Sequence, residues 1–265
     1  MLRLLTPPPL AGASGPPPRL ATQNREDFCQ PFARPRTIRY PSPMFRLAKF
    51  LLSLIIGFIL LSLAVVILYR FVPVPVTATM LMDENGITKD WEPLADIDRD
   101  MVRAVIAGED GKFCRHNGFD TAAILSAARE NLEGGRIRGG STISQQTAKN
   151  VFLWQGGGFF RKGLEAWFTF LIENLWGKRR IMEVYLNVAE TGIGTYGAEA
   201  GAQRYFDKSA ANLSVTEAAR MAAALPDPKD RAVRSPSGWT RRYGNMIRAR
   251  IGVVRRDGLD ACVYR

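Results

Sequence analysis

The sequence contains a single histidine, His116, and only three cysteines, at positions 29, 114 and 262. With one histidine, a metal site built from several histidines is excluded, and a Ser-His-Asp triad is disfavoured. Because the cysteines are odd in number and widely spaced, they indicate neither a disulfide framework nor a paired-cysteine metal site. A Cys114–Cys262 bridge would require both residues to lie outside the cytoplasm, and the sequence does not favour one.

The chain also lacks an internal repeat and, beyond residue 90, any alternating strand pattern of useful length. Apolar residues instead recur at helical spacing, with Asp120 as a cap and Ser214-x-x-Glu217 as a capping box. We therefore predict a mainly α-helical domain. Its expected helices cover residues 101–108, 121–132, 141–150, 161–176, 179–186, 213–225 and 243–254.

The net charge of +11 is distributed unevenly along the chain. Residues 1–49 carry eight Lys or Arg and only two acidic residues. A basic excess favours nucleic acid, anionic lipid or phosphate-bearing substrates as partners. Since half of the excess lies beside an apolar segment, we predict a membrane and no nucleic-acid partner.

The apolar segment runs from Phe50 to Tyr69 without a charged residue in its 20 positions. About 20 apolar residues in a helix span the ~30 Å hydrocarbon core of a bilayer. Five Lys or Arg lie within residues 34–49, whereas only Arg70 follows closely, so the N-terminus is expected in the cytoplasm and the rest outside. A cleaved signal peptide is the alternative; the length of the run and the lack of a small-x-small site in residues 70–76 disfavour it.

These features divide the chain into five expected parts. Residues 1–43 are rich in Pro, Gly, Ser and Arg and are predicted to be a disordered extension that activity does not require. Residues 44–71 form the transmembrane anchor and residues 72–90, which begin with Pro-rich VPVPV, an extended linker. A catalytic domain over residues 91–258 and a tail over residues 259–265 complete the chain.

Two adjacent carboxylates, Glu109 and Asp110, follow the first predicted helix of the catalytic domain. The negative end of a helix dipole raises the pKa of a carboxylate and improves it as a general base. The alternative is a solvated helix end with His116 capping it or packing against it.

A Gly139-Gly140-Ser141 sequence opens another predicted helix. Backbone N–H groups at such a helix start can bind phosphate, and this helix adds further polar donors. An ordinary capped helix after a loop is the alternative. The donors are Ser141, Gln145, Gln146 and Lys149.

Further along, Arg161, Lys162 and Glu165 share part of a helix face. They form either a surface ion pair worth only ~0.3–0.5 kcal/mol or a second catalytic carboxylate flanked by diphosphate-binding cations. The next predicted helix is interpreted mainly as a charged helix with a core stripe of Ile181, Val184 and Tyr185. Glu183 and Asn187 could brace the cleft from behind.

Taken together, residues 109–120, 139–150, 161–165 and 178–187 resemble the motifs of the peptidoglycan glycosyltransferases. This family includes the monofunctional biosynthetic transglycosylases and the matching domain of bifunctional penicillin-binding proteins. The resemblance covers roughly residues 45–255, and a chain that ends at Arg265 implies the monofunctional form. It also implies a lysozyme-like helical head with a small, apolar jaw near the membrane. One departure stands out, because many relatives have an Arg about where this chain has Gly157.

The resemblance implies that lipid II is joined into β-1,4 glycan, with inversion at the sugar and release of undecaprenyl pyrophosphate. Glu109 would be the general base, Asp110 would support it and contact substrate, and Glu165 would assist departure of the diphosphate. Lys149, Arg161 and Lys162 would bind diphosphate. Sugar and phosphate oxygens would be held by Ser141, Gln145 and Gln146, and the structural supports would be His116, Glu183 and Asn187.

No cofactor or metal-binding residue is required by this scheme, although Mg²⁺ or Mn²⁺ could bridge the diphosphate and a carboxylate. The expected partners are lipid II, the growing glycan strand, membrane lipid and other cell-wall synthases. The expected location is the bacterial inner membrane, with a single span and a periplasmic catalytic domain. A membrane-anchored lysozyme-like hydrolase and a non-catalytic scaffold for cell-wall synthases remain as alternatives.

Overall fold

The computed structural model of the chain describes residues 43–132 and 140–264. Apart from Pro43, the extension expected to be disordered lies outside these residues. Contacts within the chain divide it after Lys49. Of the first part the structure describes only residues 43–49, which begin helix α1; the remainder of the description concerns residues 50–264.

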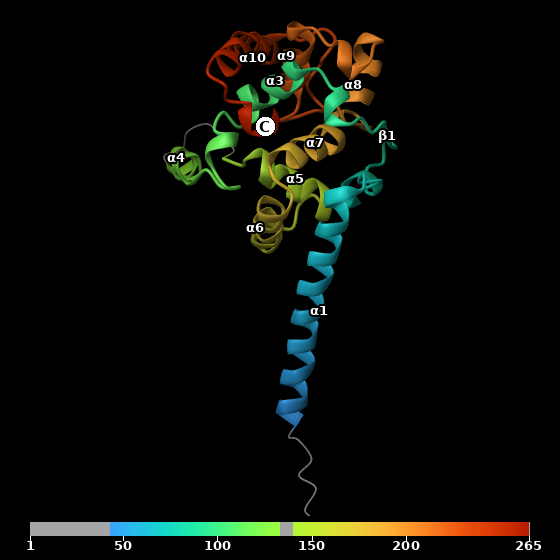
Figure 1. Cartoon of the computed structure of the whole chain (residues 1–265), viewed down its shortest axis with the longest axis vertical. Helices are drawn as coiled ribbons and strands as arrows, with labels where there is room; N and C mark the ends of the chain where they lie inside the picture. Colours follow the sequence, from blue (N-terminus) through green and yellow to red (C-terminus); the bar gives the residue numbers. More distant parts are fainter. Residues whose placement is uncertain (1–42, 133–139, 265) are drawn as a thin grey trace, which may run out of the picture. The chain divides into compact units, whose positions relative to one another are not determined.

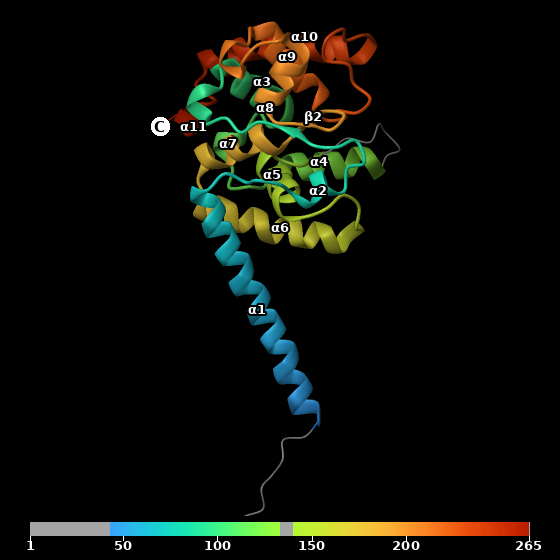
Figure 2. The ribbon, with the colours of Figure 1, turned by 90° about the vertical axis from the view of Figure 1, so that its right-hand side faces the viewer.

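Helix α1 (Pro43–Phe71) has 29 residues, contains an 18-residue stretch with a mean hydropathy of 3.1, and has mostly exposed side chains. It is long and apolar enough to cross a membrane, which confirms the predicted apolar helix and is consistent with a membrane anchor. Near its C-terminal end it packs against α6 (Gly158–Leu175) and the residue that follows (Figure 2). Trp167 Nε1 donates to Ser62 Oγ at 3.1 Å, and Trp176 Nε1 donates to the Val66 carbonyl at 2.7 Å.

The catalytic domain is built from two groups of helices. In one, α3 (Arg99–Glu109) packs against α9 (Val215–Ala224) and α10 (Gly238–Arg256). In the other, α5 (Ile143–Phe152) packs against α6 and α7 (Lys178–Val188). Figures 1 and 2 both place α10 and α6 on opposite sides of the domain, with α5 and α7 between them.

The packing follows from the sequence pattern. The apolar face of α3 is buried, and five buried alanines on α9 allow neighbouring helices to approach closely. The domain is mainly α-helical, as predicted. The remaining helices are α2 (Ala78–Leu81), α4 (Thr121–Leu132), α8 (Ala198–Phe206), α11 (Ala261–Tyr264) and the 3₁₀ turns Leu94–Asp96, Phe113–Arg115 and Ala210–Asn212.

Several helix ends agree with the sequence analysis. Helix α4 has the predicted bounds, with Asp120 Oδ1 accepting from Ala123 N at 3.0 Å. The Ser214–Glu217 capping box of α9 also forms. Helix α5 begins two residues later than expected because Thr142, rather than a residue before Ser141, supplies its cap. Helices α6 and α10 begin earlier than expected, and α8 and α11 were not predicted.

A small sheet was also missed. Strand β3 (Thr195–Tyr196) pairs in parallel with β1 (Thr88–Lys89) and antiparallel with β2 (Glu190–Gly192). Strands of two or three residues are too short to show alternation. Because β1 and α2 fall within residues 72–90, the expected extended linker is only partly extended.

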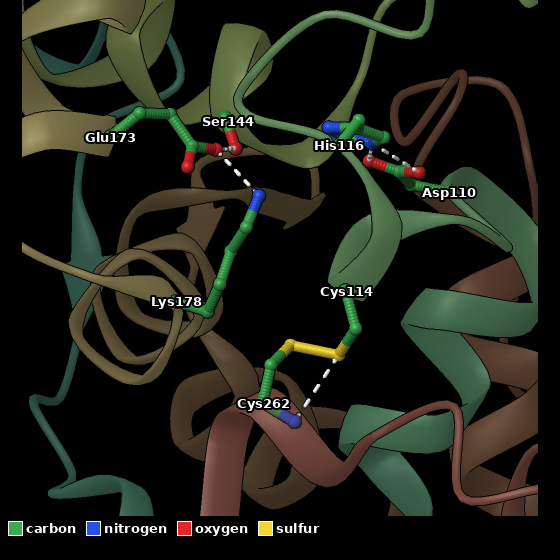
Figure 3. The surroundings of a disulfide bond; sticks show 7 residues. All are labelled: Asp110, Cys114, His116, Ser144, Glu173, Lys178 and Cys262. Atoms are coloured by element: carbon green, nitrogen blue, oxygen red, sulfur yellow. Dashed lines mark hydrogen bonds and ion pairs between the residues drawn. A yellow bond between two sulfur atoms is a disulfide. The ribbon is translucent and has the colours of Figure 1, made fainter.

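The structure also contains a Cys114–Cys262 disulfide, with a Cα–Cα distance of 5.5 Å, which the sequence did not favour. It joins the 3₁₀ turn after α3 to α11 (Figure 3). The two residues are 148 positions apart, so their proximity is created by the fold and cannot be read from spacing.

Candidate active site

A cavity of about 900 Å³ lies among α3, α5, α6 and α10. Both carboxylates predicted to be catalytic line it, although they come from different helices. The residues used below that line the cavity are Glu109, Ser141, Gln146, Lys149, Glu165 and Arg231.

Glu109 is the last residue of α3, and its two carboxylate oxygens have different surroundings. Oε2 accepts a 2.8 Å hydrogen bond from Gln146 Nε2, whereas Oε1 is buried without a hydrogen-bond partner among the described residues. Burial raises the pKa of Glu109, and the Gln146 bond and the charge of Arg231 lower it less than burial raises it. A desolvated carboxylate beside a cavity is suited to accept a proton from a bound hydroxyl.

Two tyrosines that the sequence analysis did not single out as site residues hold this region in place. Tyr185 is buried, and its O–H donates to Gln146 Oε1 at 3.1 Å, which directs the amide nitrogen of Gln146 toward Glu109. Burial keeps the pKa of Tyr185 well above its ordinary value, so it remains a donor. Tyr243 donates to the Gly108 carbonyl at 2.7 Å and so braces the end of α3. Tyr185 was predicted only as part of a core stripe.

Glu165 on α6 is only 2% exposed and is held between two cations. Arg161 Nη1 lies 2.8 Å from its Oε2, and Lys162 Nζ pairs with its Oε1. Lys162 also donates to Ser141 Oγ at 3.2 Å, so the cluster links α6 to the residues before α5. Burial of the acid argues against an ordinary exposed ion pair, which was one of the two sequence interpretations.

Lys149 on α5 lines the same cavity as both carboxylates. Among the described residues, none forms a hydrogen bond or ion pair with its ammonium group. Burial lowers the pKa of Lys149, and the charges of Glu165 and Glu109 counteract this. An unpaired cation beside the two acids is available to an anionic substrate group.

At the start of α5, where the sequence suggested a phosphate-binding site, two backbone N–H groups are bonded to side chains of the protein. Gln145 Oε1 accepts from Thr142 N at 3.1 Å in a capping box, and Asp110 Oδ2 accepts from Ile143 N at 3.1 Å. These N–H groups are therefore occupied by the protein itself. Gln145 and Asp110, both expected to contact substrate, are buried in this arrangement and do not line the cavity.

The segment between α3 and α4 is attached to its neighbours at several points (Figure 3). His116 Nε2 lies 3.0 Å from both oxygens of Asp110, which is itself bonded to the start of α5. The Gly118 carbonyl accepts from Thr142 Oγ1 at 2.6 Å, and Cys114 is held by the disulfide. This arrangement favours His116 and Asp110 as supports for the end of α3.

Glu183 and Asn187 on α7 hold the segment that precedes α3. Asn187 exchanges two 2.8 Å hydrogen bonds with the backbone of Glu92, and Glu183 Oε2 accepts from Leu94 N at 3.4 Å. Neither residue lines the cavity, so their positions fit the bracing role expected of them.

The chain around Gly157 explains how the site is built without an Arg at this position. Gly157 has a φ of 82°, and a Cβ there would lie 3.0 Å from Arg161 Cβ and 3.1 Å from Trp154 Nε1. Arg161 Nε donates to the Gly156 carbonyl, so this turn positions Arg161 instead. A further cation, Arg231, lines the cavity from the α9–α10 connection; no sequence pattern indicated it.

Within the described ranges, the acidic residues that could converge on a metal ion are Asp90, Glu92 and Glu199. They do not line the cavity, and Glu199 Oε2 already accepts from Ala210 N at 2.6 Å. The expectation that no metal is required therefore remains a prediction.

An apolar helix long enough to cross a membrane precedes this helical domain. Its cavity is lined by a desolvated carboxylate, a carboxylate bound by two cations and a lysine without a partner among the described residues. A base and fixed positive charge in one cavity define a class of enzymes suited to group transfer. Comparison with known proteins identifies the family. A family model described as Transglycosylase matches residues 77–250. The chain belongs to this transglycosylase family.

Individual relatives agree with this assignment. The chain is 51% identical to a biosynthetic peptidoglycan transglycosylase of Caulobacter vibrioides over 220 residues, 82% of this chain and 96% of the relative. It is 46% identical to a protein of the same description from Rhodospirillum centenum, over 82% of this chain and 96% of the relative. A third, from Bdellovibrio bacteriovorus, is 48% identical over 73% of this chain and 81% of the relative.

Proposed function

We propose that this protein is a peptidoglycan glycosyltransferase that polymerises lipid II into β-1,4-linked glycan and releases undecaprenyl pyrophosphate. Family membership supports the activity. The observation that carries the chemical proposal is that Glu109, Lys149 and Glu165 line one cavity. A transferase that expels a diphosphate needs a base and fixed positive charge in the same space.

In the proposed reaction, Glu109 accepts the proton of the acceptor 4-hydroxyl group. That oxygen attacks the anomeric carbon of the donor sugar, and the bond from this carbon to the diphosphate oxygen breaks. Attack from the face opposite the leaving group converts an α-linked donor to a β-linked product. The free Oε1 of Glu109 supports this role, because Gln146 engages only Oε2.

The departing diphosphate gains negative charge, which the cations near Glu165 are placed to stabilise. Lys149 is unpaired among the described residues, and Arg161 and Lys162 are held by Glu165. Because both oxygens of Glu165 are engaged by cations, its proposed role is to orient them. These side chains supply the charge that a divalent cation would otherwise provide, so we expect polymerisation to persist in a strong chelator.

The proposed setting is the bacterial inner membrane, with the catalytic domain on the periplasmic side. Basic residues before α1 support this orientation, and the Cys114–Cys262 disulfide supports an oxidising compartment. At the start of α6, Phe159 and Phe160 are 97% and 72% exposed. Aromatic rings are favoured at the bilayer interface, so these residues support an apolar jaw that contacts membrane lipid. Contacts with other cell-wall synthases remain a prediction.

The function is tested by incubating the detergent-solubilised full-length protein with labelled lipid II. Long glycan products are expected from the wild type and not from Glu109→Gln. Shortening of isolated sacculi without polymer would favour the hydrolase instead. Equal polymer from the wild type and Glu109→Gln would contradict the role of this acid and favour a scaffold acting with a contaminating synthase.

A further inference from the structure

Helix α10 forms one wall of the cavity. This wall carries positive charge that the proposed reaction does not use. Its side chains are Trp239, Tyr243, Met246 and Arg250, which lie on one helix face, together with Arg231 from the preceding connection. We call these five residues the α10 wall. All of them line the cavity that contains Glu109.

Arg231 is held in a defined position in this wall. Its guanidinium carbon lies 4.2 Å from the ring centre of Trp239, and Nη1 donates to the Ala223 carbonyl at 3.3 Å. The Trp239 ring in turn stacks on Tyr243 with 4.5 Å between ring centres. A guanidinium fixed on an aromatic face keeps several N–H donors free for a ligand.

Among the residues that the structure describes, neither arginine of the wall has an acidic partner. Across residues 43–132 and 140–264, no carboxylate lies within ion-pair distance of Arg231 or Arg250, although Glu109 and Glu130 line the same cavity. Arg255 on the same helix does pair, with Asp100. Two arginines that face a cavity without an acidic partner among the described residues form a site for an anionic ligand.

The position of the wall indicates which anion it meets. The cations around Glu165 belong to α6, which contacts α1, so the lipid-linked diphosphate is expected on that side. Helix α10 lies on the opposite side of the domain (Figures 1 and 2). We therefore expect an anion bound there to belong to a part of the substrate remote from its lipid.

We propose that the α10 wall binds the carboxylate groups of the peptide arm carried by a peptidoglycan precursor, with Arg231 and Arg250 as the anion-binding residues. This inference rests on the proposed function. Arg231 and Arg250 form charge-assisted hydrogen bonds to the carboxylates, and the side chains of Tyr243 and Met246 provide apolar contact between them. The site makes the enzyme selective for a charged peptide arm.

The test compares two lipid-linked substrates with identical sugars and diphosphate, one with free peptide carboxylates and one with these groups amidated. Arg231→Gln and Arg250→Gln are each expected to raise KM for the carboxylate substrate about tenfold, since a charged hydrogen bond is lost from ground-state binding. The readout is KM, because loss of the Arg231 charge also raises the pKa of Glu109 and so affects kcat. Neither variant should alter KM for the amidated substrate. Arg248→Gln, an exposed arginine of α10 outside the cavity, is the matched control.

An equal rise in KM for both substrates would assign the arginines to the diphosphate or the sugars and overturn the proposal. Unchanged KM for both substrates would also overturn it. Arg250 is exposed, so Arg250→Gln retains the fold even if replacing Arg231 disturbs its packing on Trp239. A wild-type protein that polymerises neither substrate would contradict the proposed function itself, which is a distinguishable outcome.

Discussion

Gln146 donates to Glu109 Oε2 at 2.8 Å, and this single bond orients the carboxylate proposed as the general base. The Gln146 amide is fixed in turn by Tyr185, which donates to its oxygen at 3.1 Å. The other oxygen of Glu109 is buried without a hydrogen-bond partner among the described residues. A residue of α7 thus controls the geometry of a base on α3 through a side chain of α5.

Tyr185→Phe tests this connection. Without the phenolic hydroxyl of Tyr185, the Gln146 amide can rotate and present its oxygen to the Glu109 carboxylate. The two groups would then repel each other. We expect kcat to fall about tenfold with KM little changed, because positioning of a base affects the transition state more than substrate binding. Steady-state kinetics with lipid II measures both values.

Tyr264→Phe is the matched control, since the Tyr264 hydroxyl is buried without a hydrogen-bond partner among the described residues and lies outside the cavity. If both variants had wild-type kcat, Tyr185 would have only a packing role.

The pH dependence of activity should reflect the burial of Glu109. As a base it must be ionised, and burial raises its pKa above the ordinary value of 4.5. We therefore expect kcat/KM to rise with pH through the raised pKa and to be lost below it. Glu109→Gln should lower kcat by about 10²–10⁴-fold and remove this rising limb from the remaining activity. A limb that persists in the variant would assign it to another group.

The stability of the folded protein should fall with rising pH, in the opposite direction to the activity. Because the pKa of Glu109 is higher in the folded protein, the folded state binds this proton more tightly than the unfolded chain. Ionisation therefore costs stability as the pH rises above 4.5 and through the folded pKa. Glu109→Gln should have a higher Tm than wild type at neutral pH, and the difference should disappear at pH values below 4.5.

Asp110, the acid next to Glu109, is expected to show the opposite effect when its charge is removed. Asp110→Asn weakens bonds to His116 and Ile143 N, so we expect a loss of about 1–3 kcal/mol in unfolding free energy. If Glu109→Gln were less stable than wild type at neutral pH, the buried charge of Glu109 would not be a net cost to the fold.

The Cys114–Cys262 disulfide should contribute strongly to stability because it closes a long loop. We expect Cys114→Ser to lose about 2–5 kcal/mol of unfolding free energy, measured by denaturant titration under oxidising conditions. Cys29→Ser, which alters the remaining cysteine, should unfold like wild type. A reducing agent should abolish the difference between wild type and Cys114→Ser; a difference that survives reduction would assign the effect to packing of Cys114.

The local features of the fold were predictable because interactions between residues close in the sequence determine them. The uninterrupted apolar run specified the anchor helix, and Asp120 and the Ser214–Glu217 pair marked helix starts correctly. Gln145 shows the limit of such inference. Its place in a conspicuous motif suggested substrate contact, yet its spacing from Thr142 also suits a capping box, and the structure has the latter.

The sequence alone determined that this is a membrane-anchored, mainly helical protein and indicated Glu109, Lys149 and Glu165 as its chemical groups. Helical period, apolar run length and motif spacing are properties of neighbouring residues. Only the tertiary structure decided that Glu109 and Glu165 share a cavity, that Tyr185 orients Gln146, that Cys114 meets Cys262 and that Arg231 enters the site. These relationships join residues distant in the chain, and the packing of α3, α5, α6 and α10 brings them within reach.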